Sequence, residues 1–303
     1  MNACVVGLGE TGAAIVSLLN HHLDDSNINI LDPSENIAGR FLDLAHATSF
    51  KDNILKLNDF NDVSDSDFLF FCAGFRNAKD GDRLSVAKQN KNLIKVVFDK
   101  LSLKKECKII VLTNPVDLIT KWINEYFSRK QLVIGTGTDL DTYRLKYILS
   151  QESKSPLSDV NIDVIGEHGQ TMVPLYSSGS IKGKKITNIF NTKQLNQITE
   201  ELKNAAKNIR KTEEATKYGV AQCAIELMEA LNSNESFSRN ISFTINSHFK
   251  ELLEIDSDIS IGIPCLINNS GVRINNDITL DNKEIELLKL SANKLIQTEI
   301  ENN

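Results

Sequence analysis

The first 32 residues carry the pattern that most limits how this chain can fold. Residues 3–6 form an apolar run that predicts a buried strand, followed by Gly7-Leu8-Gly9-Glu10-Thr11-Gly12 and a helix-like segment at residues 13–20. Another apolar run at residues 28–31 predicts a second strand, which ends at Asp32. A strand, a glycine turn, a helix and a strand ending in an acid are typical of the dinucleotide-binding βαβ unit. The chain is therefore predicted to begin as a doubly wound parallel α/β fold.

The glycines and the acid of this unit each have a physical role in binding a dinucleotide. Gly7 permits the tight turn, Gly9 lets backbone amides approach a pyrophosphate, and Gly12 allows the helix to pack closely on the strand. The helix N-terminus adds the positive end of its dipole. Asp32, 20 residues after Gly12, is placed to accept hydrogen bonds from ribose hydroxyls and would repel a 2′-phosphate. We therefore predict NAD as the cofactor, bound by the three glycines and Asp32.

Two later apolar runs predict further strands of a parallel sheet. Residues 68–72 and 109–112 are unbroken apolar segments, as expected of strands that are buried on both faces. The polar segment at residues 75–83 follows the first run, at the strand end where ligands bind in open α/β sheets. This segment fits a lid over a ligand and equally an ordinary solvated loop. Asn114-Pro115 follows the second run, and it fits either a cis bond that projects Asn114 into the same cleft or a simple turn.

Beyond residue 150 the pattern changes from parallel to antiparallel. Short alternating segments there predict twisted ribbons, and they are interspersed with amphipathic helices. We predict a Rossmann doubly wound parallel sheet in residues 1–140 and an α+β domain in residues 141–303. In the second half we expect strands at residues 159–165, 175–181, 241–249 and 259–264 and helices at residues 194–212, 216–231 and 282–299.

One histidine has the sequence context of a catalytic group. His168 follows an apolar strand and stands in Ile165-Gly-Glu-His-Gly169, so it is predicted to lie at a strand tip. With an unperturbed pKa of about 6.5, histidine exchanges protons readily near neutral pH. Asp141 and Arg144 are three residues apart in a predicted helix and therefore share one face. From these residues alone, a structural histidine and an ordinary surface ion pair remain open alternatives.

The composition excludes several classes of partner. Among 303 residues the net charge is −6, and no Lys/Arg block predicts a nucleic-acid or membrane surface. No apolar run reaches the roughly 18 residues of a membrane span. The cysteines are five, widely spaced and without a CxxC pair, which predicts reduced thiols in a cytoplasmic protein and no metal site. A strand beginning near the first residue leaves no room for a signal peptide.

Taken together and in this order, the motifs resemble those of the L-lactate/malate dehydrogenase superfamily along the full length of the chain. Gly135-Thr-Gly-Thr138 with Leu140-Asp-Thr142, and Gly81-Asp-Arg83, are similar to lactate and L-2-hydroxyisocaproate dehydrogenases. In contrast, residues 171–175 are more similar to malate dehydrogenases. The motifs that carry the resemblance are Gly7–Gly12, Asp32, Thr113–Asp117, Gly135–Arg144, Gly166–Gly169 and Ser260–Leu266.

The resemblance implies a role for each matching residue. His168 matches the acid/base that exchanges a proton with the substrate oxygen, and Asp141 matches the carboxylate that orients it. Arg144 matches the anchor for the substrate carboxylate, and Arg83 matches a lid arginine that stabilises charge on the carbonyl oxygen. The remaining matches are Asn114 and Thr216 beside the substrate, Val220 in the wall of the pocket on the cofactor side, and Arg76 near the pyrophosphate.

The substrate prediction rests on the lid residue after Arg76. Lactate enzymes of the superfamily typically carry glutamine there and malate enzymes arginine, whereas this chain has Asn77. A neutral Asn77 would leave a second substrate carboxylate without a counter-charge, which favours pyruvate or a larger monocarboxylic 2-oxo acid. Gly81 lies one position closer to Arg83 than in typical lactate enzymes. A one-residue slip would therefore turn Arg76 toward the substrate, so malate dehydrogenase is the alternative.

The resemblance implies an NAD-dependent L-2-hydroxy acid dehydrogenase that transfers hydride reversibly between NADH and a small 2-oxo acid. It also implies a homo-oligomer, either a dimer or a tetramer. A non-catalytic NAD-sensing protein would tolerate loss of Arg83, Asp141, Arg144 or His168, yet all four are present. An oxidoreductase with unrelated substrates is a further alternative, and a requirement for a 2-oxo carboxylate would exclude it.

Overall fold

The computed structural model describes residues 1–75 and 83–302, and within them it leaves out the side chains of residues 83–85 and 87. The strands are β1 Ala3–Val6, β2 Asn27–Leu31, β3 Ile54–Leu57, β4 Phe68–Phe71, β5 Lys108–Val111, β6 Leu132–Gly135, β7 Val160–Asn161, β8 Val164–Ile165, β9 Val173–Pro174, β10 Ser180–Ile181, β11 Lys184–Lys185, β12 Phe237–Thr244, β13 Ser260–Asn268 and β14 Gly271–Ile274. The helices are α1 Glu10–His22, α2 Ala38–Thr48, α3 Arg83–Phe98, α4 Val116–Tyr126, α5 Asp139–Ser153, α6 Ile186–Ile189, α7 Thr192–Ile209, α8 Tyr218–Asn232, α9 Ser247–Leu253 and α10 Asn282–Asn302.

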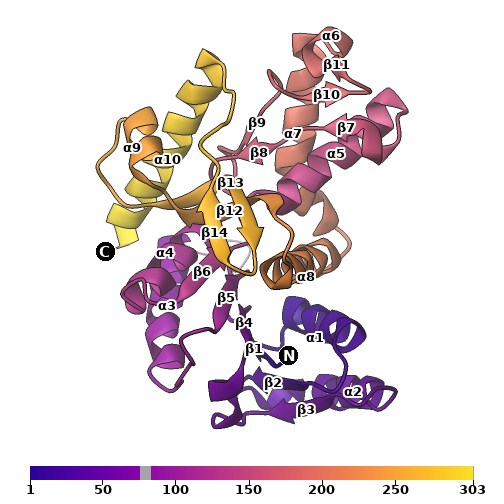
Figure 1. Cartoon of the computed structure of the whole chain (residues 1–303), viewed down its shortest axis with the longest axis vertical. Coiled ribbons are helices and arrows are strands. Elements are labelled where there is room, and N and C mark those ends of the chain that lie inside the picture. The colour runs from indigo at the N-terminus through magenta and orange to yellow at the C-terminus, as the bar shows by residue number, and fades with distance from the viewer. Residues whose placement is uncertain (76–82, 303) are drawn as a thin grey trace.

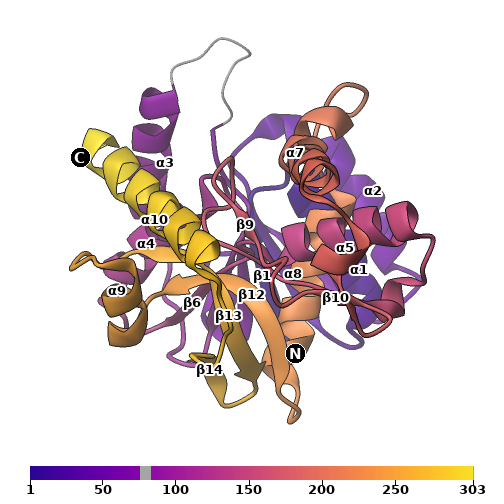
Figure 2. The same ribbon diagram turned by 90° about the horizontal axis from the view of Figure 1, so that it is seen from above.

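The first six strands form the doubly wound parallel sheet that the sequence predicts. Their order is β3-β2-β1-β4-β5-β6, and every neighbouring pair is parallel. Helices α1, α2 and α8 lie on one face, and α3, α4 and α10 lie on the other, as Figures 1 and 2 show. Since both faces are covered, strands such as β4 bury all their residues, which explains their unbroken apolar runs.

The second half of the chain extends this sheet instead of building a large sheet of its own. β12 pairs antiparallel with β6 through Ser242 and Gly135, and β13 and β14 continue the same sheet. A side chain at Gly135 would come within 2.9 Å of the Ser242 Cβ atom, so the glycine allows the two halves to join here. The sheet therefore has nine strands among the described residues, and only the last three are antiparallel to their neighbours.

The predicted ribbons are shorter in the structure than the sequence pattern indicates. Residues 159–165 form two separate strands, β7 and β8, and residues 175–181 contribute only β10. The reason at residues 175–179 is a turn that α10 holds in place: the Ser177 backbone N–H and hydroxyl both donate to Glu284, at 3.0 and 2.6 Å. The predicted strand 241–249 ends at Thr244 because the Asn246 side chain caps the following helix α9.

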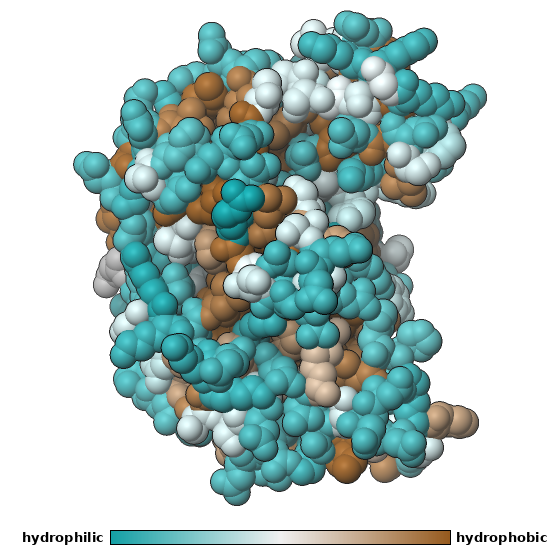
Figure 3. Space-filling view, in the orientation of Figure 1, coloured by the Kyte–Doolittle hydropathy of each residue, from teal (hydrophilic) through white to brown (hydrophobic). Residues whose placement is uncertain are grey.

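Two groups of buried side chains stabilise the molecule. The larger one fills both faces of the nine-stranded sheet. A smaller one, which includes Leu145, Leu149, Val164 and Leu202, packs α5 and α7 against the short strands of the second half. Hydrophilic side chains cover most of the face in Figure 3, where the outline narrows between the upper part, with β7, β10 and α6, and the lower part, with α1 and α2. Within the described residues, no helix is long and apolar enough to span a membrane.

Candidate active site

The sheet register brings several loops of the chain to one edge. Val6, Phe71, Val111 and Gly135 are aligned across β1, β4, β5 and β6, and each is the last residue of its strand. The residues that follow these strands therefore lie side by side at the carboxyl edge of the sheet, where ligands bind in this type of fold. They include Gly7, Asn114 and Thr136.

The glycine turn has the geometry that close approach of a dinucleotide needs. Gly7 has φ +93°, and a Cβ atom there would lie 2.7 Å from the Ala73 backbone nitrogen. A Cβ atom at Gly12 would lie 2.0 Å from the Gly7 carbonyl oxygen, so only glycine lets α1 pack this closely on β1. Gly9 is the N-cap of α1 and provides no side-chain cap, which leaves the positive end of the helix available to an anion.

Asp32 lies beside this turn, at the end of β2. Its carboxylate accepts the Leu8 backbone N–H at 2.7 Å and the Ser34 backbone N–H at 2.9 Å. These bonds hold both oxygens in place, and their remaining lone pairs can accept ribose hydroxyls. The predicted set of Gly7, Gly9, Gly12 and Asp32 is therefore assembled at one place and fits NAD.

The sequence analysis missed two cations beside the glycine turn. Arg40 on α2 donates to the Leu8 carbonyl oxygen at 2.8 Å and pairs with Glu10 at the start of α1. Lys217, just before α8, lies 3.1 Å from the other oxygen of Glu10. These contacts tie the turn to both α2 and α8. Arg40 is 30 residues and Lys217 is 207 residues away from Glu10 in the chain, so no local sequence pattern could indicate these contacts.

His168 is held at a strand tip by contacts from three elements. Gly166, with φ +94°, exchanges two backbone hydrogen bonds with Gly262 of β13, at 2.8 and 3.0 Å. The Glu167 N–H donates to the Ser291 hydroxyl of α10 at 2.6 Å, and the His168 N–H donates to Asp117 of α4 at 2.9 Å. The backbone on both sides of the imidazole is therefore fixed, as an acid/base group requires.

Asp141 joins the imidazole to a guanidinium. One carboxylate oxygen lies 2.6 Å from His168 Nδ1, and the other accepts Arg144 Nη1 at 3.0 Å. The Asp141 side chain is fully buried, whereas His168 and Arg144 are 22% and 15% exposed. Burial acts to raise the pKa of Asp141, but the charges and hydrogen bonds of His168 and Arg144 outweigh it, so the pKa is lowered and the group stays ionised.

The same pair raises the affinity of His168 for a proton. Burial of the ring acts to lower its pKa, yet the charge and hydrogen bond of Asp141 outweigh this, so the pKa of His168 is raised above its ordinary value of 6.5. The buried carboxylate of Asp117 adds to this effect from the backbone side. The ring therefore holds a proton more strongly than a free imidazole, and Asp141 fixes the ring through Nδ1, which leaves Nε2 for chemistry.

Asp117 is a third residue of the site that was not predicted from the sequence. Burial raises the pKa of its carboxyl to about 6, although the hydrogen bond from the His168 backbone N–H acts in the opposite direction. Its Oδ2 atom accepts the His168 N–H from a position 51 residues earlier in the chain. The Asn-Pro-Val-Asp motif was recognised, but the sequence contains no local signal that its aspartate supports the histidine loop.

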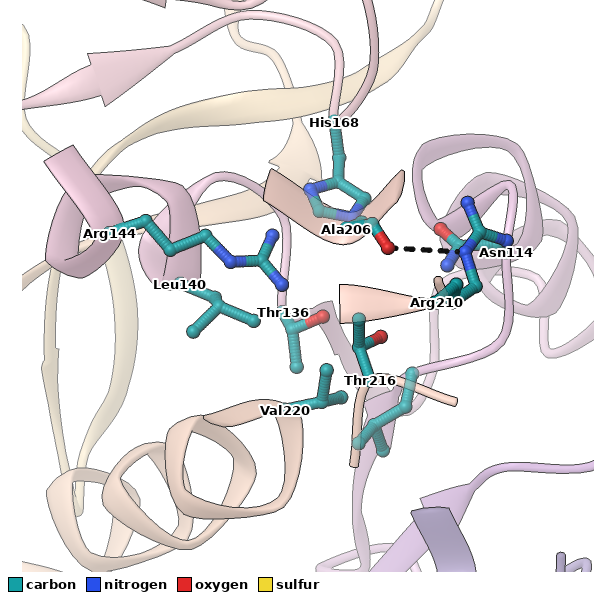
Figure 4. A pocket seen from close by; sticks show the side chains of 10 residues that line it. Asn114, Thr136, Leu140, Arg144, His168, Ala206, Arg210, Thr216 and Val220 are labelled. Atoms are coloured by element: carbon teal, nitrogen blue, oxygen red, sulfur yellow. Dashed lines mark hydrogen bonds between the residues drawn. The ribbon is translucent and has the colours of Figure 1, made fainter. Parts of the chain in front are cut away.

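A cavity of about 100 Å³ lies beside the imidazole, and most of the predicted substrate-binding residues line it. Figure 4 shows His168 and Arg144 directed toward it, with Asn114, whose peptide bond to Pro115 is cis, on another side. Thr216 and Val220 line it from the α8 end, as the resemblance implies. The sequence analysis missed five further lining residues, which are Leu112, Thr136, Leu140, Ala206 and Arg210.

Three predicted site residues come from the segment after β4. Arg76 and Asn77 lie outside the residues that the structure describes, and α3 begins at Arg83, whose side chain is not described. Their roles therefore stay predictions. Of the missed cavity residues, Thr136 could have been recognised because it directly follows a buried strand, whereas Arg210 lies at the end of a long polar helix without any motif.

This arrangement defines the class of the protein. A dinucleotide turn, an imidazole paired with a buried carboxylate, and a guanidinium in the same cavity are the parts of a nicotinamide-dependent dehydrogenase that acts on a small carboxylic acid. Within the described residues, no group of three or more His, Cys, Asp or Glu side chains could hold a metal ion.

Comparison with known proteins places the chain in a family. The family models for the lactate/malate dehydrogenase NAD-binding domain and α/β C-terminal domain match residues 1–134 and 138–302. The chain belongs to the lactate/malate dehydrogenase family. It is 30% identical to L-lactate dehydrogenase 1 of Staphylococcus aureus (strain USA300 / TCH1516), over 96% of this chain and 93% of that protein.

Solved structures agree over the whole chain. A lactate dehydrogenase from a Medee basin deep-sea metagenome library has a TM-score of 0.88 at 25% identity and covers 99% of this chain and 98% of its own. L-lactate dehydrogenase from Clostridium thermocellum has a TM-score of 0.83 at 29% identity, with the same coverage. The predicted α/β fold, the NAD cofactor and a lactate-dehydrogenase-like 2-hydroxy acid dehydrogenase, which acts on a CH–OH group, are confirmed.

Proposed function

We propose that this chain interconverts a 2-oxo acid and its L-2-hydroxy acid, with His168 exchanging the proton and Arg144 binding the substrate carboxylate. The observation that carries the proposal is the single cavity that both side chains line, together with the 2.6 Å contact between His168 Nδ1 and Asp141. NAD, when bound at the glycine turn, supplies or takes up the hydride. In the reducing direction the His168 imidazolium donates its Nε2 proton to the carbonyl oxygen, and in the oxidising direction neutral Nε2 accepts the hydroxyl proton.

The other predicted residues complete this proposal. The resemblance assigns to Arg83 the stabilisation of charge on the carbonyl oxygen, and it assigns Asn77 and Arg76 to the same lid. Asn114 and Thr216 would contact the substrate, and Val220 the cofactor side of the cavity. We also propose that residues 1–140 form the NAD-binding domain and residues 141–303 the substrate domain, since the two family models divide the chain at nearly the same place.

Arg144 provides the first test of the proposed roles. We expect Arg144→Lys to raise the KM for the 2-oxo acid by about 100-fold and to change kcat much less, because lysine cannot form the two parallel hydrogen bonds of a guanidinium with a carboxylate. Steady-state rates of NADH oxidation measure both constants. Arg129→Lys, on the exposed surface, serves as the matched control, and an unchanged KM in Arg144→Lys would refute the anchor role.

Asp32 provides a test of cofactor choice. We expect Asp32→Ser to lower the preference for NADH over NADPH by about 10-fold to 100-fold, because the variant no longer repels a 2′-phosphate and loses an acceptor for the ribose hydroxyls. The measurement compares kcat/KM for the two cofactors at one fixed concentration of 2-oxo acid. If the ratio stays as in the wild type, another residue discriminates the ribose.

The length and charge of the substrate side chain are a separate question. The relatives are L-lactate dehydrogenases, which favours lactate as the hydroxy acid, and the neutral Asn77 favours monocarboxylic acids in general. A second candidate function, that of a malate dehydrogenase, is favoured by Arg210, a guanidinium in the cavity that no motif indicated. Reduction of pyruvate, 2-oxoisocaproate, phenylpyruvate and oxaloacetate, compared by kcat/KM, decides between them. No reduction of any 2-oxo acid would refute the proposed function itself.

Two properties of the whole protein complete the proposal. We propose a cytoplasmic location because all five cysteines are free and four of them are buried, as expected in a reducing compartment. We propose a homo-oligomer, either a dimer or a tetramer, from the resemblance to the superfamily. Exposed aromatic side chains on α5 and α8, such as Tyr143, Tyr147 and Tyr218, are consistent with a subunit contact.

A further inference from the structure

A carboxylate lies at the end of α1 where the glycine turn would bind an anion. Glu10 is the first residue of α1 and directly follows Gly9, the N-cap, which makes no side-chain hydrogen bond. The N–H groups of a first helical turn and the positive end of the helix dipole attract negative charge. The Glu10 carboxylate is therefore stabilised at this position, but it repels the pyrophosphate of a dinucleotide that binds at the same turn.

Two cations from distant parts of the chain offset the charge of Glu10. Arg40 of α2 pairs with one carboxylate oxygen, and Lys217 Nζ lies 3.1 Å from the other. Arg40 also donates to the Leu8 carbonyl oxygen at 2.8 Å, so its guanidinium is held by two groups of the turn. Arg40 is therefore part of the turn itself, whereas Lys217 reaches it from the second half of the chain.

The contacts of Lys217 allow its ammonium group to change partners. The side chains of Lys217 and Glu10 are each 20% exposed, and a partly exposed ion pair contributes little to stability. The ammonium also lies 3.6 Å from the carboxylate of Glu213 and 5.3 Å from the ring centre of Tyr218, and both of these side chains are exposed. A lysine has three donors on a flexible stem, so it can turn from one anion to another that lies nearby.

Lys217 also stands between the two parts of the candidate active site. It directly follows Thr216, which lines the substrate cavity, and it is the N-cap of α8, which packs against α1 (Figure 1). A cation at the N-terminal end of a helix is disfavoured by the helix dipole, so stabilisation of α8 does not explain this lysine. A dinucleotide that reaches from the glycine turn to the cavity extends past the pair of Glu10 and Lys217.

We propose that Lys217 binds the pyrophosphate of the cofactor and that Glu10 holds Lys217 when no cofactor is bound. This proposal rests on the proposed binding of NAD at the glycine turn. On binding, the pyrophosphate replaces the Glu10 carboxylate as the partner of the ammonium group. Glu10 therefore competes with the cofactor for Lys217, and this competition lowers the affinity for the cofactor.

An ion pair that only stabilises the fold makes a different prediction. It would tie α1 to α8, and removal of either partner would disturb the glycine turn in the same way. Both single variants would then bind a dinucleotide more weakly. If Lys217 binds the pyrophosphate, the two variants have opposite effects, because one removes a partner of the anion and the other removes its competitor.

The experiment measures the dissociation constant of ADP-ribose by titration calorimetry, since ADP-ribose contains the pyrophosphate of NAD but cannot transfer hydride. We expect Lys217→Met to raise this Kd by about 10-fold, and Glu10→Gln to lower it by about threefold. The double variant Glu10→Gln/Lys217→Met should bind ADP-ribose more weakly than Glu10→Gln alone. Lys184→Met on β11 and Glu152→Gln on α5, both at exposed positions, are the matched controls and should leave the Kd unchanged.

The outcomes separate this inference from the proposed function. If the wild type binds ADP-ribose but Lys217→Met binds it equally well, Lys217 does not contact the pyrophosphate and the inference is wrong, while the proposed function stands. A Kd of Glu10→Gln that equals or exceeds the wild-type value also overturns it, and this result does not depend on whether Lys217→Met folds. If the wild type does not bind ADP-ribose, the proposed cofactor site fails and the inference fails with it.

Discussion

Replacing His168 by asparagine is expected to lower kcat by about 10²-fold to 10⁴-fold, the contribution of a positioned acid/base group. Asparagine is similar in size and polar, but it cannot hold or release a proton near neutral pH. The backbone contacts of His168 with Asp117 and of Gly166 with Gly262 do not depend on the ring, so the loop should keep its place. The glycine turn lies on a different part of the sheet edge, and NADH affinity should therefore change by less than about twofold.

The measurement combines steady-state rates with a direct titration of NADH by its fluorescence. His248→Asn is the matched control because His248 is exposed on α9, away from the cavity. Nearly normal turnover in His168→Asn would show that another group transfers the proton. Loss of NADH binding in the same variant would indicate a disrupted fold instead of a lost acid/base group.

Replacing Asp141 by asparagine is expected to shift the pH dependence of the reaction as well as its rate. Reduction of the 2-oxo acid needs the His168 imidazolium, so activity is present below the pKa of His168 and is lost as pH rises through it. Asp141 raises that pKa above 6.5. Without its charge, burial of the ring remains and lowers the pKa. In Asp141→Asn the loss of activity should therefore begin at lower pH, and kcat/KM near pH 7 should fall by about 10³-fold.

The pH profile of kcat/KM for 2-oxo acid reduction between pH 5 and 9 tests this prediction. Asp256→Asn, at an exposed position, is the matched control. The His168–Asp141 pair also links pH to stability: the raised pKa of His168 stabilises the fold below 6.5, and this contribution is lost as pH rises through the folded-state value. The lowered pKa of Asp141 stabilises the fold above 3.8, and that contribution is lost as pH falls through the folded-state value. If kcat/KM of Asp141→Asn decreases over the same pH range as that of the wild type, the proposed effect of Asp141 on the pKa of His168 is contradicted.

The sequence predicted the parts of the site that lie within contiguous motifs. Gly7 and Gly12 could be assigned because a tight turn and a close helix–strand contact require glycine wherever they occur. Asp32 could be assigned because it ends the second strand of the same unit. His168, Asp141 and Arg144 were recognised through the resemblance, and the structure brings them together through Asp141. The lid residues Arg76 and Asn77 lie outside what the structure describes, so their predicted roles are untested.

The parallel half of the fold and the type of cofactor could be predicted from local sequence patterns. Buried parallel strands appear in the sequence as unbroken apolar runs, and the glycine turn appears as glycines at short spacing. Both patterns involve only residues that are close together in the chain. The predicted strand boundaries in the second half differ from the observed ones, because turns such as that at Ser177 are held by Glu284, a residue 107 positions away. Short polar strands have no strong periodic pattern in the sequence from which their boundaries could be predicted.

In contrast, local patterns could not predict which distant residues share the cavity or how the two halves of the chain are joined. Asp117 supports His168, β12 extends the parallel sheet from β6, and Arg210 lies in the same cavity as Arg144. Each of these relationships depends on helices and strands packing against partners far away in the chain. Such packing maximises buried apolar surface over the whole molecule, so no short segment of sequence contains it.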